Sequence, residues 1–314
     1  MKTKISIIGT GNVGATLAYL IIQAELTDVV LYDVVEGMPQ GKALDISEAA
    51  PLWISSSAIT GTNDYAPTAQ SDIIVVTAGF PRKPNMTRDD LLYANAKVVS
   101  EVVERTAALS PNSIFIIVTN PVDVMAQLSL KISGFKRERV IGMGGILDSA
   151  RFRTFVAWEA GVSPRDVEAL VLGGHGDQMV PMSRYTTVKG VPVTELFSKE
   201  RVDALVQRTR DGGAEIISLL KYGSAYYAPA AAIFHMVKSI ICDENRLLPC
   251  SAYLSGEYGE HDVYTGVPVV LGKAGIEKII ELKLNEQEEA DFAKSAKTVK
   301  NFVAKLGNPS HKMQ

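Results

Sequence analysis

Cysteine is scarce in this sequence. Only Cys242 and Cys250 occur among its 314 residues. Two cysteines are too few for a disulfide framework or for a Cys-rich metal site. Their scarcity excludes a small secreted domain held together by disulfides and favours a reducing compartment. The cytoplasm is the simplest such location.

Long apolar runs are also missing. No stretch approaches the ~20 apolar residues that a membrane-spanning helix needs. Residues 1–4 lead directly into an expected strand at residues 5–8, which leaves no room for a signal peptide. We therefore expect no association with membranes.

Neither sign of charge dominates. The sequence has 32 Lys and Arg against 35 Asp and Glu, a formal net charge of −3, and the two signs are interspersed. This balance excludes the basic surface that nucleic acids require and favours a small molecule as the partner. The length and the 46% hydrophobic content allow a large core and two domains.

The first half of the chain alternates short apolar strands with helical segments. We predict strands at residues 5–8, 29–32, 73–77, 114–118 and 139–143, and helices from Val13, at 41–50, at 91–109 and after Pro121. This alternation is typical of an α/β fold with a doubly wound parallel sheet of the Rossmann type.

The pattern changes beyond Gly144 and Gly145. We predict a helix at 146–158, paired strands near 167–172 and 188–193, and long helical stretches further on. The sequence therefore indicates two packed domains, an N-terminal Rossmann domain at 1–144 and a C-terminal α+β domain at 145–314.

A glycine-rich loop follows the first strand and opens the first helix. It is formed by Gly9, Thr10, Gly11, Asn12, Val13 and Gly14, and Asp33 ends the next strand. In a dinucleotide-binding unit such glycines allow a tight turn close to the pyrophosphate, and the acid binds ribose hydroxyls. Asp33 would repel the 2′-phosphate of NADP, so the predicted cofactor is NAD. Without this context, a glycine motif is often an ordinary turn.

Two more segments should border the same crevice, since ligands of such sheets lie beyond the carboxyl ends of the strands. They contain Thr77, Ala78, Gly79, Val118, Thr119 and Asn120. We also assign Asn95 to the cofactor site. The Asn120–Pro121 peptide is either cis, with the asparagine near cofactor and substrate, or a helix N-cap followed by proline at the first helical position.

His175 lies in a glycine-rich turn, residues 173–177, just beyond the predicted strand at 167–172. An accessible histidine can exchange a proton near neutral pH, and a carboxylate can fix its tautomer. Asp148 and Arg151 lie three residues apart on one face of a predicted helix, so one can orient the imidazole while the other binds an anionic substrate. The alternative is a histidine with a purely structural role in the turn.

A polar segment with two prolines, residues 80–88, is predicted to form a lid. It contains Arg82 and Arg88, which with Arg151 would place three guanidinium groups around one cleft. Guanidinium groups bind carboxylates through two hydrogen bonds, so the substrate is expected to be an anion. Taken singly, each arginine is more typical of a solvated surface charge. The histidines and cysteines show no recognisable pattern of metal ligands, and we predict no metal.

Together these motifs resemble the NAD-dependent lactate and malate dehydrogenases, in particular the lactate-dehydrogenase-like malate dehydrogenases of bacteria. The resemblance covers nearly the whole chain. Its most specific parts are the glycine loop with Asp33, residues 82–88, Asn120 with Pro121, residues 147–151 and residues 174–177. The resemblance implies that His175 exchanges a proton with the substrate oxygen and that Asp148 pairs with His175. It also implies that Arg88 polarises the reacting carbonyl and that Arg151 binds the C1 carboxylate.

Within that family, Arg82 indicates the substrate. Lactate dehydrogenases typically have glutamine here, whereas malate dehydrogenases have an arginine that meets a second carboxylate. The resemblance thus implies reversible conversion of malate and oxaloacetate with NAD, a reaction of the tricarboxylic acid cycle, by a homodimer or homotetramer. Three alternatives stay open: a lactate or other 2-hydroxyacid dehydrogenase, an NAD-dependent glycosidase that relies on a metal, and a protein that keeps the fold without catalysis.

Overall fold

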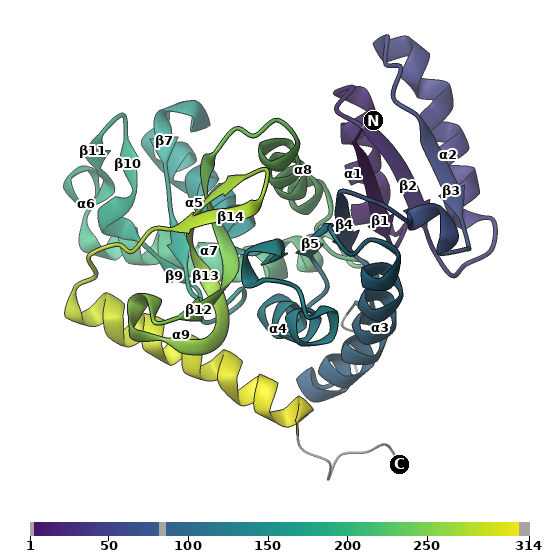
Figure 1. Cartoon of the computed structure of the whole chain (residues 1–314). Coiled ribbons are helices and arrows are strands. Elements are labelled where there is room, and N and C mark those ends of the chain that lie inside the picture. Colours follow the sequence, from purple (N-terminus) through teal and green to yellow (C-terminus); the bar gives the residue numbers. More distant parts are fainter. Residues whose placement is uncertain (1–2, 82–85, 308–314) are drawn as a thin grey trace.

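The computed structural model describes residues 3–81 and 86–307 (Figure 1). Within them one nine-stranded sheet runs in the order β14-β13-β12-β6-β5-β4-β1-β2-β3. The strands from β6 to β3 are parallel. Their bounds are β1 Lys4–Ile8, β2 Asp28–Tyr32, β3 Ile59–Thr62, β4 Ile73–Val76, β5 Ile114–Ile117 and β6 Val140–Gly142. This confirms the predicted α/β fold, although the sequence analysis did not locate β3.

The central parallel strands are short apolar runs covered on both faces. Every residue of β4 and of β5 is buried, as is β1 from Ile5 onward. Parallel strands with helices on both sides have no solvent face, so they show no alternation of polar and apolar residues. The uninterrupted apolar runs in the first half of the sequence therefore indicate a parallel sheet that is covered on both faces.

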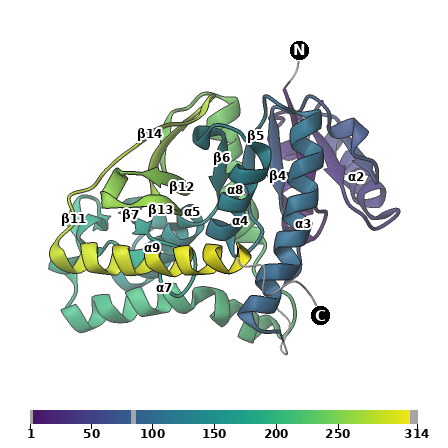
Figure 2. The ribbon, with the colours of Figure 1, turned by 60° about the horizontal axis from the view of Figure 1, so that its bottom comes forward.

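The helices begin and end close to the predicted positions. They are α1 Asn12–Gln23, α2 Met38–Ala49, α3 Arg88–Leu109, α4 Val122–Ser133, α5 Gly145–Ala160, α6 Val193–Leu196, α7 Lys199–Leu220, α8 Tyr227–Ile241 and α9 Glu286–Leu306. Helix α3 begins three residues before the predicted start, because Thr87 and Asp90 form a reciprocal capping box. Figure 2 shows α9 next to α4, which it contacts.

The C-terminal half contains the expected long helices α7, α8 and α9, and between α8 and α9 it contains strands that were not located from the sequence. These are β12 Arg246–Ser255, β13 His261–Gly272 and β14 Gly275–Ile279, which pair antiparallel. Most of β12 and β13 is buried on both faces, so their apolar runs lack the period of two that marks a half-exposed strand. Strand β12 joins β6 through Ser251 and Gly142, so the sheet continues across the suggested domain boundary.

The predicted strand at 167–172 is two short strands in different sheets. Strand β7, Val167–Glu168, pairs with β10, Thr187–Val188, whereas β8, Val171–Leu172, pairs with β9, Val180–Pro181. The predicted strand at 188–193 is likewise divided. Lys189 and Gly190 have positive φ and form a tight turn between β10 and β11, Val191–Pro192. A two-residue turn of this kind suits a hairpin.

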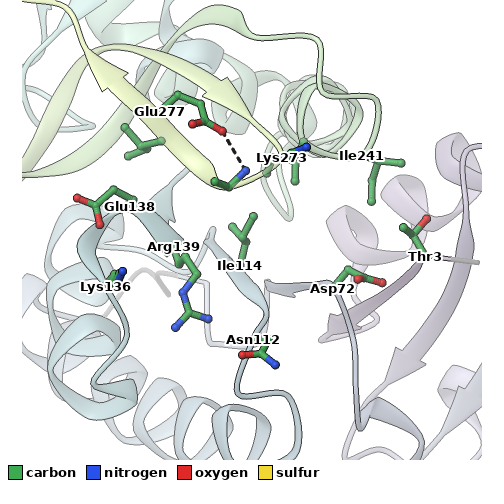
Figure 3. A pocket seen from close by; sticks show the side chains of 13 residues that line it. Thr3, Asp72, Asn112, Ile114, Lys136, Glu138, Arg139, Ile241, Lys273 and Glu277 are labelled. Atoms are coloured by element: carbon green, nitrogen blue, oxygen red, sulfur yellow. Dashed lines mark hydrogen bonds between the residues drawn. The ribbon is translucent and has the colours of Figure 1, made fainter. Parts of the chain in front are cut away.

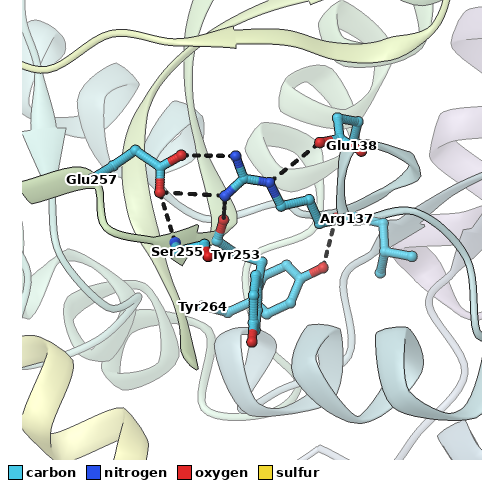
Figure 4. Close-up of polar contacts among 7 residues, drawn as sticks. Arg137, Glu138, Tyr253, Ser255, Glu257 and Tyr264 are labelled. Atoms are coloured by element: carbon cyan, nitrogen blue, oxygen red, sulfur yellow. Dashed lines mark hydrogen bonds and ion pairs between the residues drawn. The ribbon is translucent and has the colours of Figure 1, made fainter. Parts of the chain in front are cut away.

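An ion pair fixes the β12–β13 hairpin to the parallel sheet (Figure 4). The guanidinium of Arg137, just before β6, donates to both carboxylate oxygens of Glu257 at 2.8 and 3.3 Å and to the carbonyl of Tyr253 at 3.2 Å. The hydroxyl of Tyr264 donates to the carbonyl of Val140 at 3.0 Å. These contacts hold β12 beside β6, which places Ser251 beneath the candidate site.

Candidate active site

The glycine loop closes tightly against the strand exits. Gly9 has φ +105°, and a Cβ there would lie 2.6 Å from the amide nitrogen of Ala78, while a Cβ on Gly14 would lie 2.0 Å from the carbonyl of Gly9. Among the described residues, by contrast, a Cβ on Gly11 would meet no atom within 4 Å, and no side chain caps α1. A helix start without a side-chain cap beside an uncrowded glycine fits the phosphates of a dinucleotide.

Asp33 is fixed beside this loop. Its Oδ2 accepts hydrogen bonds from the amide of Thr10 at 2.7 Å and from its hydroxyl at 3.0 Å, and its Oδ1 accepts one from the amide of Val35 at 3.0 Å. The ammonium of Lys42 donates to the carbonyl of Thr10. Lys42 was not assigned to this site from the sequence, because only the fold of α2 brings it back to the loop.

The exits of β4 and β5 border the same loop. The hydroxyl of Thr77 donates to the carbonyl of Gly9 at 2.8 Å, and that of Thr119 donates to the carbonyl of Ala78 at 2.6 Å. The peptide between Asn120 and Pro121 is cis. The alternative reading, with proline inside the first turn of the helix, is wrong: α4 begins one residue later and proline occupies the N-cap position.

His175 lies three residues beyond β8, and its ring is held by a carboxylate. Its Nδ1 lies 2.7 Å from Oδ2 of Asp148, a buried residue of α5, and its side chain is 15% exposed. Because a carboxylate only accepts, Nδ1 donates, which leaves Nε2 for proton exchange. Burial by itself would lower the pKa of His175, but the charge and hydrogen bond of Asp148 outweigh it and raise the pKa above its ordinary value.

Arg151 lies on the same face of α5. Its Nη1 donates to the second oxygen of Asp148 at 3.2 Å, and its buried Nε has no partner among the described residues. Its side chain packs on α7, where a Cβ on Gly212 would lie 3.2 Å from Cδ of Arg151. This contact was not predicted from the sequence. The signal was a pair of glycines, Gly212 and Gly213, inside an otherwise strong helical pattern.

Asp123 is a second carboxylate that the sequence analysis missed. It is buried in α4, where Oδ2 accepts from the backbone amide of His175 at 2.8 Å and Oδ1 accepts from the hydroxyl of Ser251 at 2.6 Å. Burial raises its pKa, and the two hydrogen bonds partly oppose that rise. The signal was an acid three residues after Asn120 in an apolar helix. Asp123 thus anchors the backbone of the histidine turn.

A cavity of about 250 Å³ lies above these residues. His175, Asn120 and Arg88 line it, together with a stripe of α9 that the sequence analysis did not associate with the site: Ser295, Thr298, Val299 and Phe302. Arg88, the first residue of α3, makes an ion pair with Asp177 in which both side chains are mostly exposed. Asp148 and Arg151 do not line this cavity, and Arg82 lies outside the described residues.

A larger cavity of about 810 Å³ lies at the other end of the parallel strands, where these strands begin (Figure 3). Its three acids already accept hydrogen bonds: Asp72 from the amide of Lys4, Glu138 from Arg137 and Glu277 from the amide of Ala274. None of the predicted site residues lines it.

Across residues 3–81 and 86–307, no three side chains of His, Cys, Asp or Glu converge as metal ligands would. In the same residues, none of the helices combines the length and apolar character needed to cross a bilayer.

This chain is similar to known proteins in both sequence and fold. Residues 3–142 match the lactate/malate dehydrogenase NAD-binding domain, and residues 146–308 match the lactate/malate dehydrogenase α/β C-terminal domain. A malate dehydrogenase of Roseiflexus sp. strain RS-1 is 56% identical over 306 residues, which cover 98% of this chain and 99% of that protein.

Solved structures show the same fold. The apo malate dehydrogenase of Picrophilus torridus superposes with a TM-score of 0.95 at 47% identity, covering 98% of each chain. A lactate dehydrogenase of Cryptosporidium parvum, complexed with lactic acid and nicotinamide adenine dinucleotide, reaches the same TM-score at 42% identity, covering 98% of this chain and 99% of its own. The fold by itself therefore does not choose between the two substrates. The matches to both domain models and the identity over nearly the full length place this chain in the lactate/malate dehydrogenase family.

Proposed function

We propose that this chain is an NAD-dependent malate dehydrogenase, which interconverts malate and oxaloacetate. The observation that carries the proposal is the His175–Asp148 pair, with Arg151 on the other oxygen of the same carboxylate. This geometry suits proton exchange beside a carboxylate-binding arginine. Relatives that are 52–56% identical over nearly the full chain are named malate dehydrogenase, which supports the choice of substrate.

In this proposal His175 is the proton donor and acceptor. Asp148 holds Nδ1 and stabilises the charged ring, so Nε2 protonates the substrate oxygen when oxaloacetate is reduced and accepts the proton when malate is oxidised. Asp123 holds the backbone of the same residue from below. The two carboxylates restrict the motion of the ring and stabilise its positive charge.

The arginines divide the work on the substrate. Arg151 binds the C1 carboxylate, and Arg88 polarises the reacting carbonyl after it leaves Asp177, with which it pairs in this structure. Arg82, outside the described residues, is assigned to the second carboxylate of oxaloacetate. Asn120 lines the cavity beside His175 and completes the substrate contacts.

The cofactor site consists of the glycine loop and the strand exits. We assign to it Gly9, Thr10, Gly11, Asn12, Val13, Gly14, Asp33, Thr77, Ala78, Gly79, Val118, Thr119 and Asn120. The uncapped start of α1 would hold the pyrophosphate, and Asp33 would accept from the ribose hydroxyls. When bound, the reduced cofactor would supply the hydride for the carbonyl carbon.

The test compares four steady-state assays: oxaloacetate and pyruvate, each with NADH and NADPH. We expect the highest kcat/KM with oxaloacetate and NADH. A higher kcat/KM with pyruvate would instead support the alternative, a lactate or other 2-hydroxyacid dehydrogenase.

We also propose that the chain assembles as a homodimer or homotetramer. Large apolar side chains are exposed on α2 and on the turn after it, including Leu44, Leu52 and Ile54, the last at 89%. Several large apolar side chains exposed within one short segment favour a subunit interface there. Light scattering should give a multiple of the monomer mass, and L52E with I54E should reduce it. An unchanged mass in that variant would mean that the interface lies elsewhere.

The remaining assignments follow from the proposed reaction. We place the protein in the cytoplasm and in the tricarboxylic acid cycle, and we assign residues 1–144 to cofactor binding and 145–314 to substrate binding. The scarcity of cysteine supports the location. The two domain models, which meet between residues 142 and 146, support the division.

A further inference from the structure

The side-chain amide of Asn95 is hydrogen-bonded to backbone groups. It lies in α3, is 1% exposed, and its Oδ1 accepts from the amide of Phe80 at 2.7 Å. Its Nδ2 donates to the carbonyl of Phe80 at 3.2 Å and to the carbonyl of Asn120 at 2.7 Å. A primary amide has two N–H donors, so none is left for a ligand.

These hydrogen bonds connect the segments that follow β4 and β5, which form two sides of the proposed cofactor crevice. Phe80 follows β4 and Asn120 follows β5, and Asn95 bridges them from a third element. The junction is tightly packed: Gly79 has φ +154°, and a Cβ there would lie 2.6 Å from Cγ2 of Thr119 and 2.9 Å from Oδ1 of Asn95. A movement of either segment relative to the other would break a hydrogen bond of Asn95.

The same contacts set the position of two residues that line the substrate cavity. Asn120 is held directly through its carbonyl. Arg88 begins α3, seven residues before Asn95, and is therefore held through the helix. Misplacement of reacting groups by about 1 Å can cost about 10²-fold in rate. The consequence of losing Asn95 should therefore fall on the substrate step.

We propose that Asn95 is a positioning residue, which serves the reaction by fixing Phe80 and Asn120 rather than by touching the cofactor. The inference rests on the proposed function for its kinetic readout only. The contacts themselves do not depend on the activity.

Two variants of the full-length protein test the proposal. N95A removes all three bonds. N95D keeps an acceptor for the amide of Phe80 but turns carboxylate oxygens toward the two carbonyls. T106V is the matched control, because Thr106 is a buried polar residue of the same helix whose hydroxyl donates to the carbonyl of Val102, away from the crevice.

We expect both Asn95 variants to lose about tenfold to 10²-fold in kcat/KM for oxaloacetate, while the Kd for NADH changes less than roughly threefold. In N95D, burial beside two carbonyls should raise the pKa of the new carboxyl, and its protonated form can again donate to Asn120. The activity of N95D relative to the parent should therefore recover as the pH falls. T106V should match the parent in each of these measurements.

Amide hydrogen exchange gives a readout that needs no activity. N95A should accelerate exchange at Phe80, whereas T106V should not. A tenfold weaker binding of NADH in N95A with an unchanged kcat would overturn the proposal in favour of direct cofactor contact. Parental kcat/KM in both variants, or unchanged exchange at Phe80, would also overturn it. If the parent itself does not reduce oxaloacetate, the proposed function fails, and the exchange measurement alone then decides the role of Asn95.

Discussion

Nδ1 of His175 and Oδ2 of Asp148 lie 2.7 Å apart, although 27 residues separate them in the sequence. The histidine belongs to a glycine-rich turn after β8, and the aspartate belongs to α5. The other oxygen of the same carboxylate accepts from Arg151. One buried acid therefore orients both the group that exchanges a proton and the group that binds the substrate.

H175N should remove most of the turnover and preserve both the fold and NADH binding. The amide cannot exchange a proton with the substrate oxygen, and general acid–base groups contribute about 10²–10⁴ in rate. The measurements are kcat with oxaloacetate, NADH fluorescence titration and circular dichroism. A folded variant with nearly parental kcat would contradict the assignment of His175.

The two directions of the reaction should depend on pH with opposite sign. The pKa of His175 is raised above its ordinary 6.5, so the protonated ring persists to higher pH. Oxaloacetate reduction needs that form and should fall as the pH rises through the raised pKa. Malate oxidation needs the neutral ring and should rise over the same interval.

D148N removes the charge that raises the pKa of His175, and it should therefore move both pH profiles to lower pH and lower the maximal rates. Profiles of kcat/KM in both directions test this expectation. Profiles that stay in place would mean that the observed titration belongs to another group.

R82Q should reverse the preference between oxaloacetate and pyruvate. Under a closed site the second carboxylate of oxaloacetate would lose its partner, and leaving one member of a buried charge pair alone costs about 2–5 kcal/mol, or roughly 30-fold to several thousand-fold. Pyruvate, with one carboxylate, should be reduced as fast or faster.

R88Q is the comparison for R82Q. Polarisation of the carbonyl is common to both substrates, so R88Q should lower kcat/KM for both by similar factors. If R82Q leaves the ratio of the two kcat/KM values within a few-fold of the parent, the role of Arg82 in choosing malate is wrong.

D33S combined with V34R should shift the preference from NADH toward NADPH. The repelling carboxylate is removed, and the new cation stands at a position that is 79% exposed and follows Asp33 directly. D33S alone controls for the loss of the bonds to Thr10. The ratio of kcat/KM for the two cofactors is the measurement, and an unchanged ratio in the double variant would exclude Asp33 from the ribose site.

G212V should weaken substrate binding by crowding Arg151. A Cβ at Gly212 lies 3.2 Å from Cδ of Arg151, whereas a Cβ at Gly213 lies no closer than 3.6 Å to that side chain. G213V makes the same substitution in the same helix and is the control. We expect KM for oxaloacetate to rise roughly tenfold in G212V, about 1.4 kcal/mol, and distinctly less in G213V. Equal effects would assign the change to the helix itself.

The sequence indicated the parallel half of the fold because the features that identify it lie close together in the sequence. Strands such as β4 are short runs of isoleucine and valine, and the glycine loop stands directly between β1 and α1. The antiparallel strands β12 and β13 were missed, because a strand buried on both faces and a buried helix present similar apolar runs. Their position depends on partners far away in the chain.

The sequence by itself determined the chemistry of the site: a histidine, an acid and arginines of the types that proton exchange and carboxylate binding require. The tertiary structure decided which of them meet. It placed Asp123 under His175, Gly212 against Arg151 and the side chains of α9 around the cavity. These contacts join residues on different elements, and a local pattern carries no information about which distant elements pack together. Only packing of the whole chain brings them within bonding distance.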